Sequence, residues 1–168
     1  MLFAAVALHI AGLRTAYSAL SKIKIVVLEF SFRDASLKGE LEGEDSADRR
    51  RLRRIRLQAE AILSRSGKYV IVDTGPYDAV INKLLANQDF DECHGCEIAV
   101  GRALGADQVL VGWVLKESNL LTYLGVRIED VHSGKVVAGK MVQIENDGDE
   151  GSRRAVSFVL EQLLTPKK

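Results

Sequence analysis

The stretch from Cys93 to Glu117 constrains the fold more than any other part of the chain. One helical face is predicted from the spacing of Cys96, Ala99, Val100, Ala103 and Leu104. Gly105 follows this face, where a left-handed residue commonly ends a helix. The apolar run from Val109 to Leu115 then predicts a strand, and its continuity indicates burial on both sides of a sheet. Gly112 within the run indicates a bulge or a close backbone approach.

The residues before this stretch alternate between strand and helix patterns. Lys24 to Phe32 is rich in β-branched, aliphatic and aromatic residues and predicts the first strand. A long amphipathic helix is expected from about Ala47 to Ser66, followed by a strand from Tyr69 to Asp73. A short second helix is expected from about Tyr77 to Leu85.

The residues after it predict a hairpin and a final helix. Leu120 to Val131 and Val136 to Glu145 alternate in polarity, and His132 to Lys135 form the turn between them. The acidic turn from Asn146 to Glu150 is suited to capping a last helix, which ends before Pro166. The expected fold is therefore α/β (α+β): a mixed sheet of about five strands with a C-terminal β-meander, flanked by three to four helices.

Length and charge set broad limits. The 168 residues fit one domain, which we place at 22–168. Lysine plus arginine equals aspartate plus glutamate, 23 of each, so net charge favours no class of partner. Residues 1–21 resemble a secretory signal or its remnant, with an apolar stretch from Leu2 to Leu13 too short to span a bilayer comfortably. The alternative is an ordinary N-terminal amphipathic helix.

The first long helix begins with a run of arginines. The members considered for partner binding are Arg49, Arg50, Arg53 and Arg54. They favour either an anionic partner or a solvated helix face whose charge is offset by acids between Glu40 and Asp48. No aromatic residue interrupts the run, so the sequence gives no support for stacking on nucleic acid bases, and no nucleic acid partner is expected.

Cys93 and Cys96 are the only two cysteines, and their C-x-x-C spacing permits three roles. In an exported protein the pair is expected to form a local disulfide at the helix start. The alternatives are a redox-active pair, since a helix N-terminus lowers a thiol pKa, and a metal site with His94. Glu97 stands where haem attachment requires histidine, so that reading fails.

The sequence contains no catalytic motif that we recognise. Ser133-Gly134-Lys135 mimics the end of a phosphate loop, but the upstream glycine is misplaced and a strand follows. Asp73, Asp107 and Asp130 lie at the ends of predicted elements, where turn hydrogen bonds account for them. We therefore expect no catalytic residues, no bound metal and no cofactor.

Several segments resemble a family of short exported proteobacterial proteins of unknown function. The matching segments are Asp34–Ser36, Gly39–Glu40, Gly67–Asp73, Gly95–Cys96, Leu104–Asp107, Val111–Val114, Val131, Ser133–Gly139, Asp149–Glu150 and Arg153–Ala155. Gly151-Ser152 departs from this pattern, because members usually carry Ser-Trp there. The resemblance implies a fold similar to the N-terminal domain of TolB and to CsgG.

The resemblance also implies a function class. It suggests a periplasmic, non-enzymatic binding or assembly module of the bacterial cell envelope, in a context linked to quinoprotein alcohol oxidation. Its partner would be an envelope or periplasmic protein, reached through an exposed sheet edge or the arginine-rich helix. The alternative is a periplasmic thiol-redox or maturation factor using Cys93 and Cys96. A weaker third possibility is a carrier of a small molecule or metal.

Overall fold

The structure is a computed structural model, and it describes residues 21–36, 39, 46–75, 78–84, 90, 92–93, 95–118, 120–145 and 148–165. The expected signal segment lies outside the described residues except for Ser21, as do Tyr77, His94 and Pro166. The elements are β1 Ile23–Val27, β2 Ser31–Asp34, α2 Ser46–Arg65, β3 Tyr69–Ile71, α3 Asp78–Leu84, α4 Cys96–Ala103, β4 Gln108–Lys116, β5 Thr122–Asp130, β6 Val136–Ile144 and α5 Asp149–Leu164. In the part described, no helix is long and apolar enough to cross a membrane.

The strands form one mixed sheet in the order β3-β1-β4-β5-β6, and β2 pairs with β4 beyond the end of β1. Strands β1 and β3 are parallel, and β4 is parallel to both β1 and β2. Strands β4, β5 and β6 form an antiparallel meander. The predicted fold class, a mixed sheet with a C-terminal meander and flanking helices, is confirmed.

The prediction of one strand from Lys24 to Phe32 is wrong in detail. The chain leaves the sheet between β1 and β2, so that β1 pairs with Gln108–Leu110 and β2 pairs with Trp113–Lys116. The ring of Phe30 occupies the space where a side chain on Gly112 would begin. The close approach predicted at Gly112 therefore exists, but a phenylalanine ring makes it rather than another backbone. The two short strands bring the total to six.

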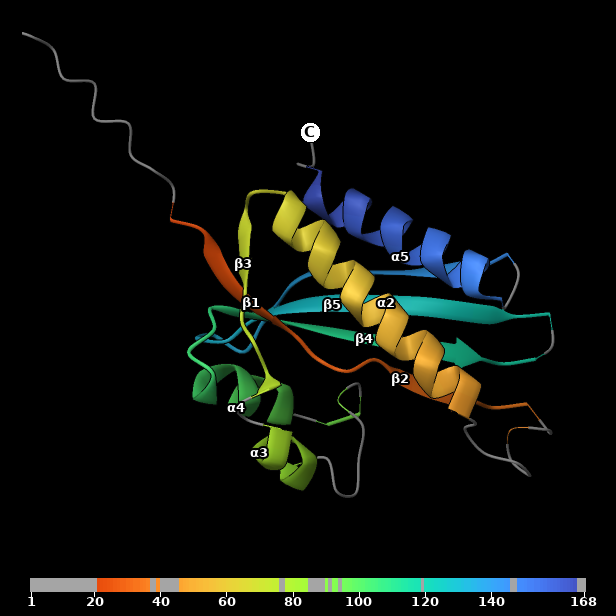
Figure 1. The fold of residues 1–168 in the computed structure, drawn as a ribbon, viewed down its shortest axis with the longest axis horizontal. Coiled ribbons are helices and arrows are strands. Elements are labelled where there is room, and N and C mark those ends of the chain that lie inside the picture. The colour runs from red at the N-terminus through yellow and green to blue at the C-terminus, as the bar shows by residue number, and fades with distance from the viewer. Residues whose placement is uncertain are drawn as a thin grey trace, which may run out of the picture.

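Helices α2 and α5 lie side by side across one face of the sheet (Figure 1). They pack on the sheet through a shared apolar core that includes Ile55, Leu63, Leu124, Val156 and Leu160, each at most 2% exposed. Gln58 joins the two helices by donating from Nε2 to the hydroxyl of Ser157 at 2.8 Å. The burial of apolar side chains in a core of this kind is the main stabilising contribution to a domain of this length.

A second, smaller core lies on the opposite face, where α3 and α4 pack at one end of the sheet (Figure 1). Its members include Val26, Leu28, Val100, Val109 and Val111. Because Leu110 belongs to the first core and its neighbours to the second, the first half of β4 is buried on both sides, as the continuous apolar run predicts. Over the second half of β4 the face opposite α2 and α5 is only partly covered, and Trp113 is half-buried there.

Turn chemistry ends these elements as the sequence indicates. Gly105 has φ of +64° and closes α4. The aspartates named above accept backbone hydrogen bonds at 2.7–3.0 Å: Asp73 from Gly75, Asp107 from Lys24, and Asp130 from Ser133. The start of α5 differs from the expectation, since Gly148 is the N-cap and no side chain caps it. Asp149 and Glu150 nevertheless supply negative charge in its first turn.

Candidate functional site

The C-x-x-C segment lies at the start of α4, with the two sulfur atoms within bonding distance and the Cα atoms 5.8 Å apart. Cys93 is buried and Cys96 is half-buried. The backbone N–H of Cys96 donates to Sγ of Cys93 at 3.0 Å. Gly95 precedes the helix with φ of +108°, which few other residues adopt. This arrangement fits a local clamp on the helix start, and the disulfide itself stays a prediction.

We expect Cys93 and Cys96 to be oxidised in the exported protein, and Cys96→Ser to lower the free energy of unfolding by no more than about 2 kcal/mol, because the closed loop is very short. Thiol trapping with mass measurement gives the redox state, and urea unfolding of the variant gives the stability. A pair that is partly reduced, or poised near −200 to −120 mV, would contradict a purely structural role.

A buried cluster of charged side chains lies beside the C-x-x-C segment. Glu97 on α4 and Glu129 on β5 are each 5% exposed, and Arg127 stands between them. The guanidinium of Arg127 is paired with Glu129, lies 3.9 Å from Glu97, and donates to the carbonyl oxygen of Phe90 at 3.1 Å. One cation therefore serves two buried carboxylates and a backbone acceptor.

This cluster has electrostatic consequences for Glu97. Burial raises the pKa of the Glu97 carboxyl, and the neighbouring Glu129 carboxylate raises it further, while the N–H of Gly95 and the Arg127 guanidinium oppose the rise. The guanidinium carbon of Arg127 also lies 5.7 Å from the centre of the Trp113 ring, a cation–π distance. Arg127 thus links α4, the sheet and the indole through contacts that only a planar cation makes together.

The sequence patterns do not reveal this cluster. Glu97 follows Cys96 at the start of a predicted helix, and Arg127 and Glu129 lie two residues apart in the strand predicted within Leu120 to Val131, far away in the chain. The register of the sheet joins them, because β5 lies beside the buried strand β4 and its second face is turned toward α4. The only local signal was an alternating strand that carries a basic and an acidic residue at positions of one face.

The same end of α4 contains the one group of ligand atoms among the described residues that is compact enough for a metal ion. The sulfurs of Cys93 and Cys96 and a carboxylate oxygen of Glu97 lie within 4.8 Å of one another. Zinc would accept two thiolates and a carboxylate, but only after any disulfide is reduced. His94, the other ligand considered from the sequence, lies outside the described residues.

The arginines of α2 differ in their exposure and in the contacts that they make. Arg54 reaches across to Asp149 on α5 at 2.6 Å, and this contact lowers the pKa of Asp149. Arg51 also lies near Asp149, and Arg56 contacts Glu29 and Glu60 at 3.0 and 2.7 Å. The arginine run therefore partly serves to join α2 to α5 and to the connection between β1 and β2.

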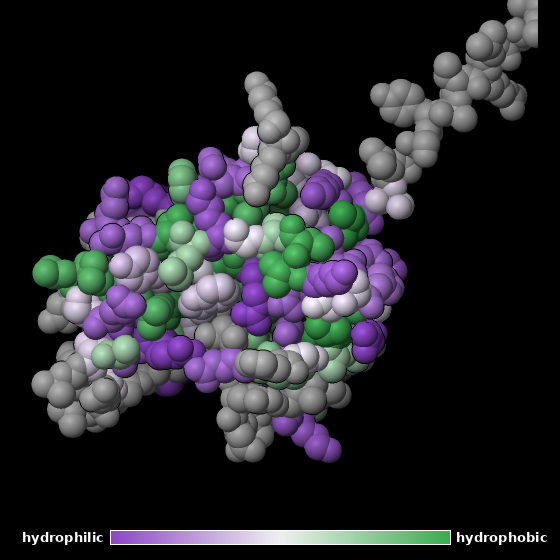
Figure 2. Space-filling view, turned by 180° about the vertical axis from the view of Figure 1, so that it is seen from behind, coloured by the Kyte–Doolittle hydropathy of each residue, from purple (hydrophilic) through white to green (hydrophobic). Residues whose placement is uncertain are grey.

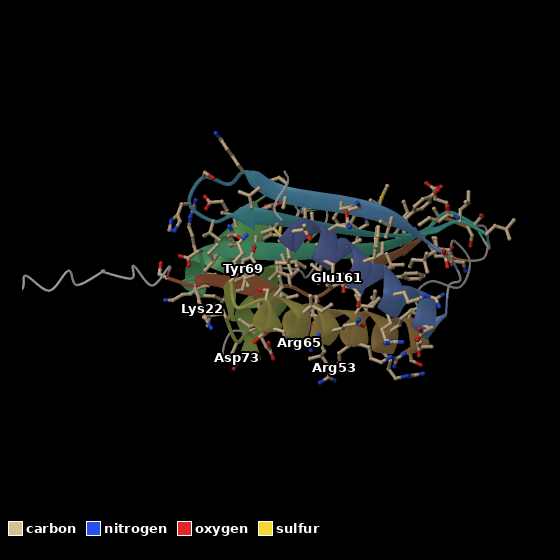
Figure 3. The ribbon with its side chains drawn as sticks, turned by 90° about the horizontal axis from the view of Figure 1, so that it is seen from above. Lys22, Arg53, Arg65, Tyr69, Asp73 and Glu161 are labelled. Atoms are coloured by element: carbon tan, nitrogen blue, oxygen red, sulfur yellow. A yellow bond between two sulfur atoms is a disulfide. The ribbon has the colours of Figure 1, made fainter. Side chains whose placement is uncertain are left out.

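The remaining members of the run are exposed. Arg49 and Arg50 lie near the start of α2, and Arg50 donates to the hydroxyl of Ser46 at 3.1 Å. Figure 3 shows Arg53 on the outer side of α2, away from α5, with Asp73 on the same side at the end of β3. Arg53 and Asp73 line a polar crevice of about 600 Å³ between α2 and the segment that follows β3. The crevice contains acids as well as arginines, so its charge does not select an anion.

A different surface is more apolar. A groove of about 320 Å³ runs between the C-terminal half of β6 and the first half of α5, lined by Val142, Gln143, Ile144, Glu145, Gly151, Arg154, Ala155 and Phe158. Strand β6 is the edge of the sheet, with no further strand beside it among the described residues. Phe158 in the lining is 50% exposed, and Met141, on the opposite face of β6 from Val142, is 53% exposed. Seen from behind, the molecule shows hydrophobic patches among hydrophilic ones (Figure 2).

Comparison with known families gives a match over nearly the whole described domain. Residues 23–164 match DUF3280, whose description is "Protein of unknown function (DUF2380)". The chain belongs to this family. The expectation that the chain is a member of a family of unknown function is confirmed. Comparison with curated proteins finds no match.

Solved structures show the fold in other bacterial proteins. The C-terminal domain of LpoB from Salmonella enterica is similar with a TM-score of 0.50 and 16% identity, over 74% of this chain and 83% of that one. Lipoprotein GNA1162 from Neisseria meningitidis also has a TM-score of 0.50 and 16% identity, over 87% of this chain and 99% of that one. TolB from Acinetobacter baumannii matches with a TM-score of 0.49 and 17% identity, over 86% of this chain and 28% of that one. At these identities the likeness concerns the fold.

Proposed function

We propose that this DUF3280 protein is a non-enzymatic binding or assembly module of the bacterial cell envelope, acting in the periplasm. The observation that carries the proposal is the edge strand β6, whose nine residues have a neighbouring strand on one side only within the part of the chain that the structure describes. Such an edge offers a row of backbone donors and acceptors to a partner strand. Val136, Val137 and Met141 add exposed apolar surface along it.

The comparisons support the envelope part of the proposal. One protein with this fold, GNA1162 from Neisseria meningitidis, is a lipoprotein, and the match covers 99% of it. The N-terminal segment of the present chain has the composition of a secretory signal. Together these observations favour an exported protein whose partner is another envelope protein.

The structure favours β6 over α2 as the contact surface. On α2, Arg51, Arg54 and Arg56 already have acidic partners within the chain. Binding a partner through these arginines would break the ion pairs within the chain. The free energy lost in this way would offset the free energy gained from the new contacts. The backbone groups at the outer edge of β6 and the exposed Met141 can contact a partner without breaking an ion pair within the chain.

We expect a photo-crosslinking residue placed at Met141 to capture an envelope protein in cells of the native host, with the product identified by mass spectrometry. The same residue placed at Leu57, which is 47% exposed on α2, is the matched control and should capture little. Crosslinking at Leu57 that equals or exceeds that at Met141 would contradict β6 as the contact surface.

The alternative contact through α2 is tested by charge reversal. If β6 is the interface, replacing Arg50 and Arg53 together with glutamate should leave the Met141 crosslink within about twofold of wild type, since exposed charges contribute little to a distant contact. Loss of the crosslink in this variant would favour the basic helix instead. A quinoprotein alcohol dehydrogenase among the captured proteins would support the metabolic context that the resemblance implies.

A thiol-redox or maturation role is the second candidate, because Cys96 is half-buried at the first position of α4 and so accessible to a partner thiol. This role requires Cys96→Ser to abolish function while the fold stays intact. A Cys96→Ser protein that retains the Met141 crosslink and only unfolds earlier would exclude it.

A further inference from the structure

We infer that the groove between β6 and α5 binds an extended peptide strand of the partner, with apolar side chains at alternate positions and an acidic residue near Lys140. The inference rests on the proposed function and adds the chemistry of the partner.

The shape of the groove fits strand addition. Its floor is made by β6 residues whose side chains face α5, Val142 and Ile144, and its wall by Ala155 and Phe158, one turn apart on α5. A strand that pairs with the outer edge of β6 turns every second side chain toward this wall. Backbone pairing would supply affinity and the groove would supply selection for apolar side chains.

The charges along the groove select the sign of the peptide. The ammonium of Lys140 lies 5.2 Å from the centre of the Phe158 ring, and no acidic side chain in the described part of the chain pairs with it. Arg154, one turn before Phe158, lies 3.8 Å from Glu145 and 3.9 Å from Glu150, at the outer limit of an ion pair. The charge of Arg154 is thus offset by these two acids, and Lys140 is the cation beside the exposed ring that no acid of the described residues offsets. A carboxylate arriving beside Phe158 would meet Lys140 directly.

The position of Lys140 also argues against a second copy of this chain as the occupant. Lys140 is the middle residue of β6, which runs from Val136 to Ile144. Full antiparallel pairing of β6 with β6 of a second copy would place the two Lys140 side chains directly opposite each other. Like charges in that position are destabilising. An acidic strand from another protein avoids this repulsion and replaces it with attraction.

The test uses the full chain immobilised against a displayed library of random ten-residue peptides. We expect the enriched sequences to alternate apolar and polar residues and to be rich in aspartate and glutamate. An enriched peptide should bind Phe158→Ala at least about tenfold more weakly than wild type. Leu57→Ala, which removes a similarly exposed apolar side chain from α2, should leave the affinity unchanged.

Reversal of Lys140 provides a readout that a structural role would not move. Selection on Lys140→Glu should enrich basic residues in place of acidic ones, while selection on the control Arg53→Glu should enrich acidic residues as before. The inference is overturned if no peptide is enriched, or if the enriched peptides bind Phe158→Ala and Lys140→Glu as tightly as wild type. If the Met141 crosslink to an envelope protein persists in that case, the proposed function stands and only the peptide-strand chemistry fails. If the peptide selection fails and the Met141 crosslink is also absent, the proposed function is contradicted as well.

Discussion

Arg127→Leu is expected to lower the free energy of unfolding by about 3–5 kcal/mol, because it leaves two buried carboxylates without their cation. Glu97 and Glu129 are each 5% exposed, so water cannot replace the guanidinium. The variant also removes the hydrogen bond to the carbonyl of Phe90 and the contact with Trp113. Urea unfolding followed by tryptophan fluorescence measures the change. Arg153→Leu is the matched control, since Arg153 is 63% exposed and pairs with Glu150 on the same helix; its expected effect is below about 1 kcal/mol.

The pH dependence gives this prediction a second readout. When folding raises the pKa of a carboxyl group, that group destabilises the fold at pH values above its pKa in the unfolded state. This penalty is lost as the pH falls toward that pKa. The pKa of Glu97 is already raised from 4.5, and removing Arg127 should raise it further. The loss in the free energy of unfolding caused by Arg127→Leu should therefore be smaller when unfolding is measured near or below pH 4.5. Adding Glu97→Gln should recover part of the loss at pH 7. An equal loss in the free energy of unfolding at pH 7 and at pH 4.5, with no recovery from Glu97→Gln, would contradict the electrostatic explanation.

Local patterns were sufficient to predict most elements of the fold. The spacing of apolar residues identified α2, α4 and α5, and alternation around a short turn identified the β5–β6 hairpin. The division of the first strand was not predictable in this way, because Leu28 and Phe30 continue the apolar run of β1. The break coincides with a contact between Phe30 and Gly112, residues far apart in the chain. Only the register between β1, β2 and β4 brings them together.

The same limit applies to the candidate sites. The two cysteines are three residues apart, so their proximity is visible in the sequence. The partner of Arg54 is Asp149 on another helix, and the partner of Glu97 is Arg127 on a strand that pairs with β4. Composition showed as many lysines and arginines together as acids, 23 of each, but could not assign one partner to another. The groove beside β6 likewise exists only because α5, the last helix, returns to pack over the edge strand.

Gly112→Ala should lower the free energy of unfolding by about 3 kcal/mol, because the added methyl group would overlap the buried ring of Phe30. Gly112 does not have a positive φ, so the alanine backbone is not strained and the effect is steric. For a domain of this size the change corresponds to a fall in Tm of roughly 6–12 °C. Gly139→Ala is the matched control on β6. A Cβ there would meet its nearest neighbours at 3.5 Å or more, an ordinary contact, and Tm should not fall.

A second substitution distinguishes this clash from a general intolerance of the central strand. Phe30→Leu alone should destabilise the fold by removing part of a ring that is 4% exposed. Combined with Gly112→Ala it should cost less than the sum of the two single changes, by more than about 1 kcal/mol, because the smaller side chain makes room for the methyl group. Strict additivity would show that Phe30 is not what requires glycine at position 112. A clear coupling would show that the ring of Phe30 is what requires a residue without a side chain at position 112 of β4.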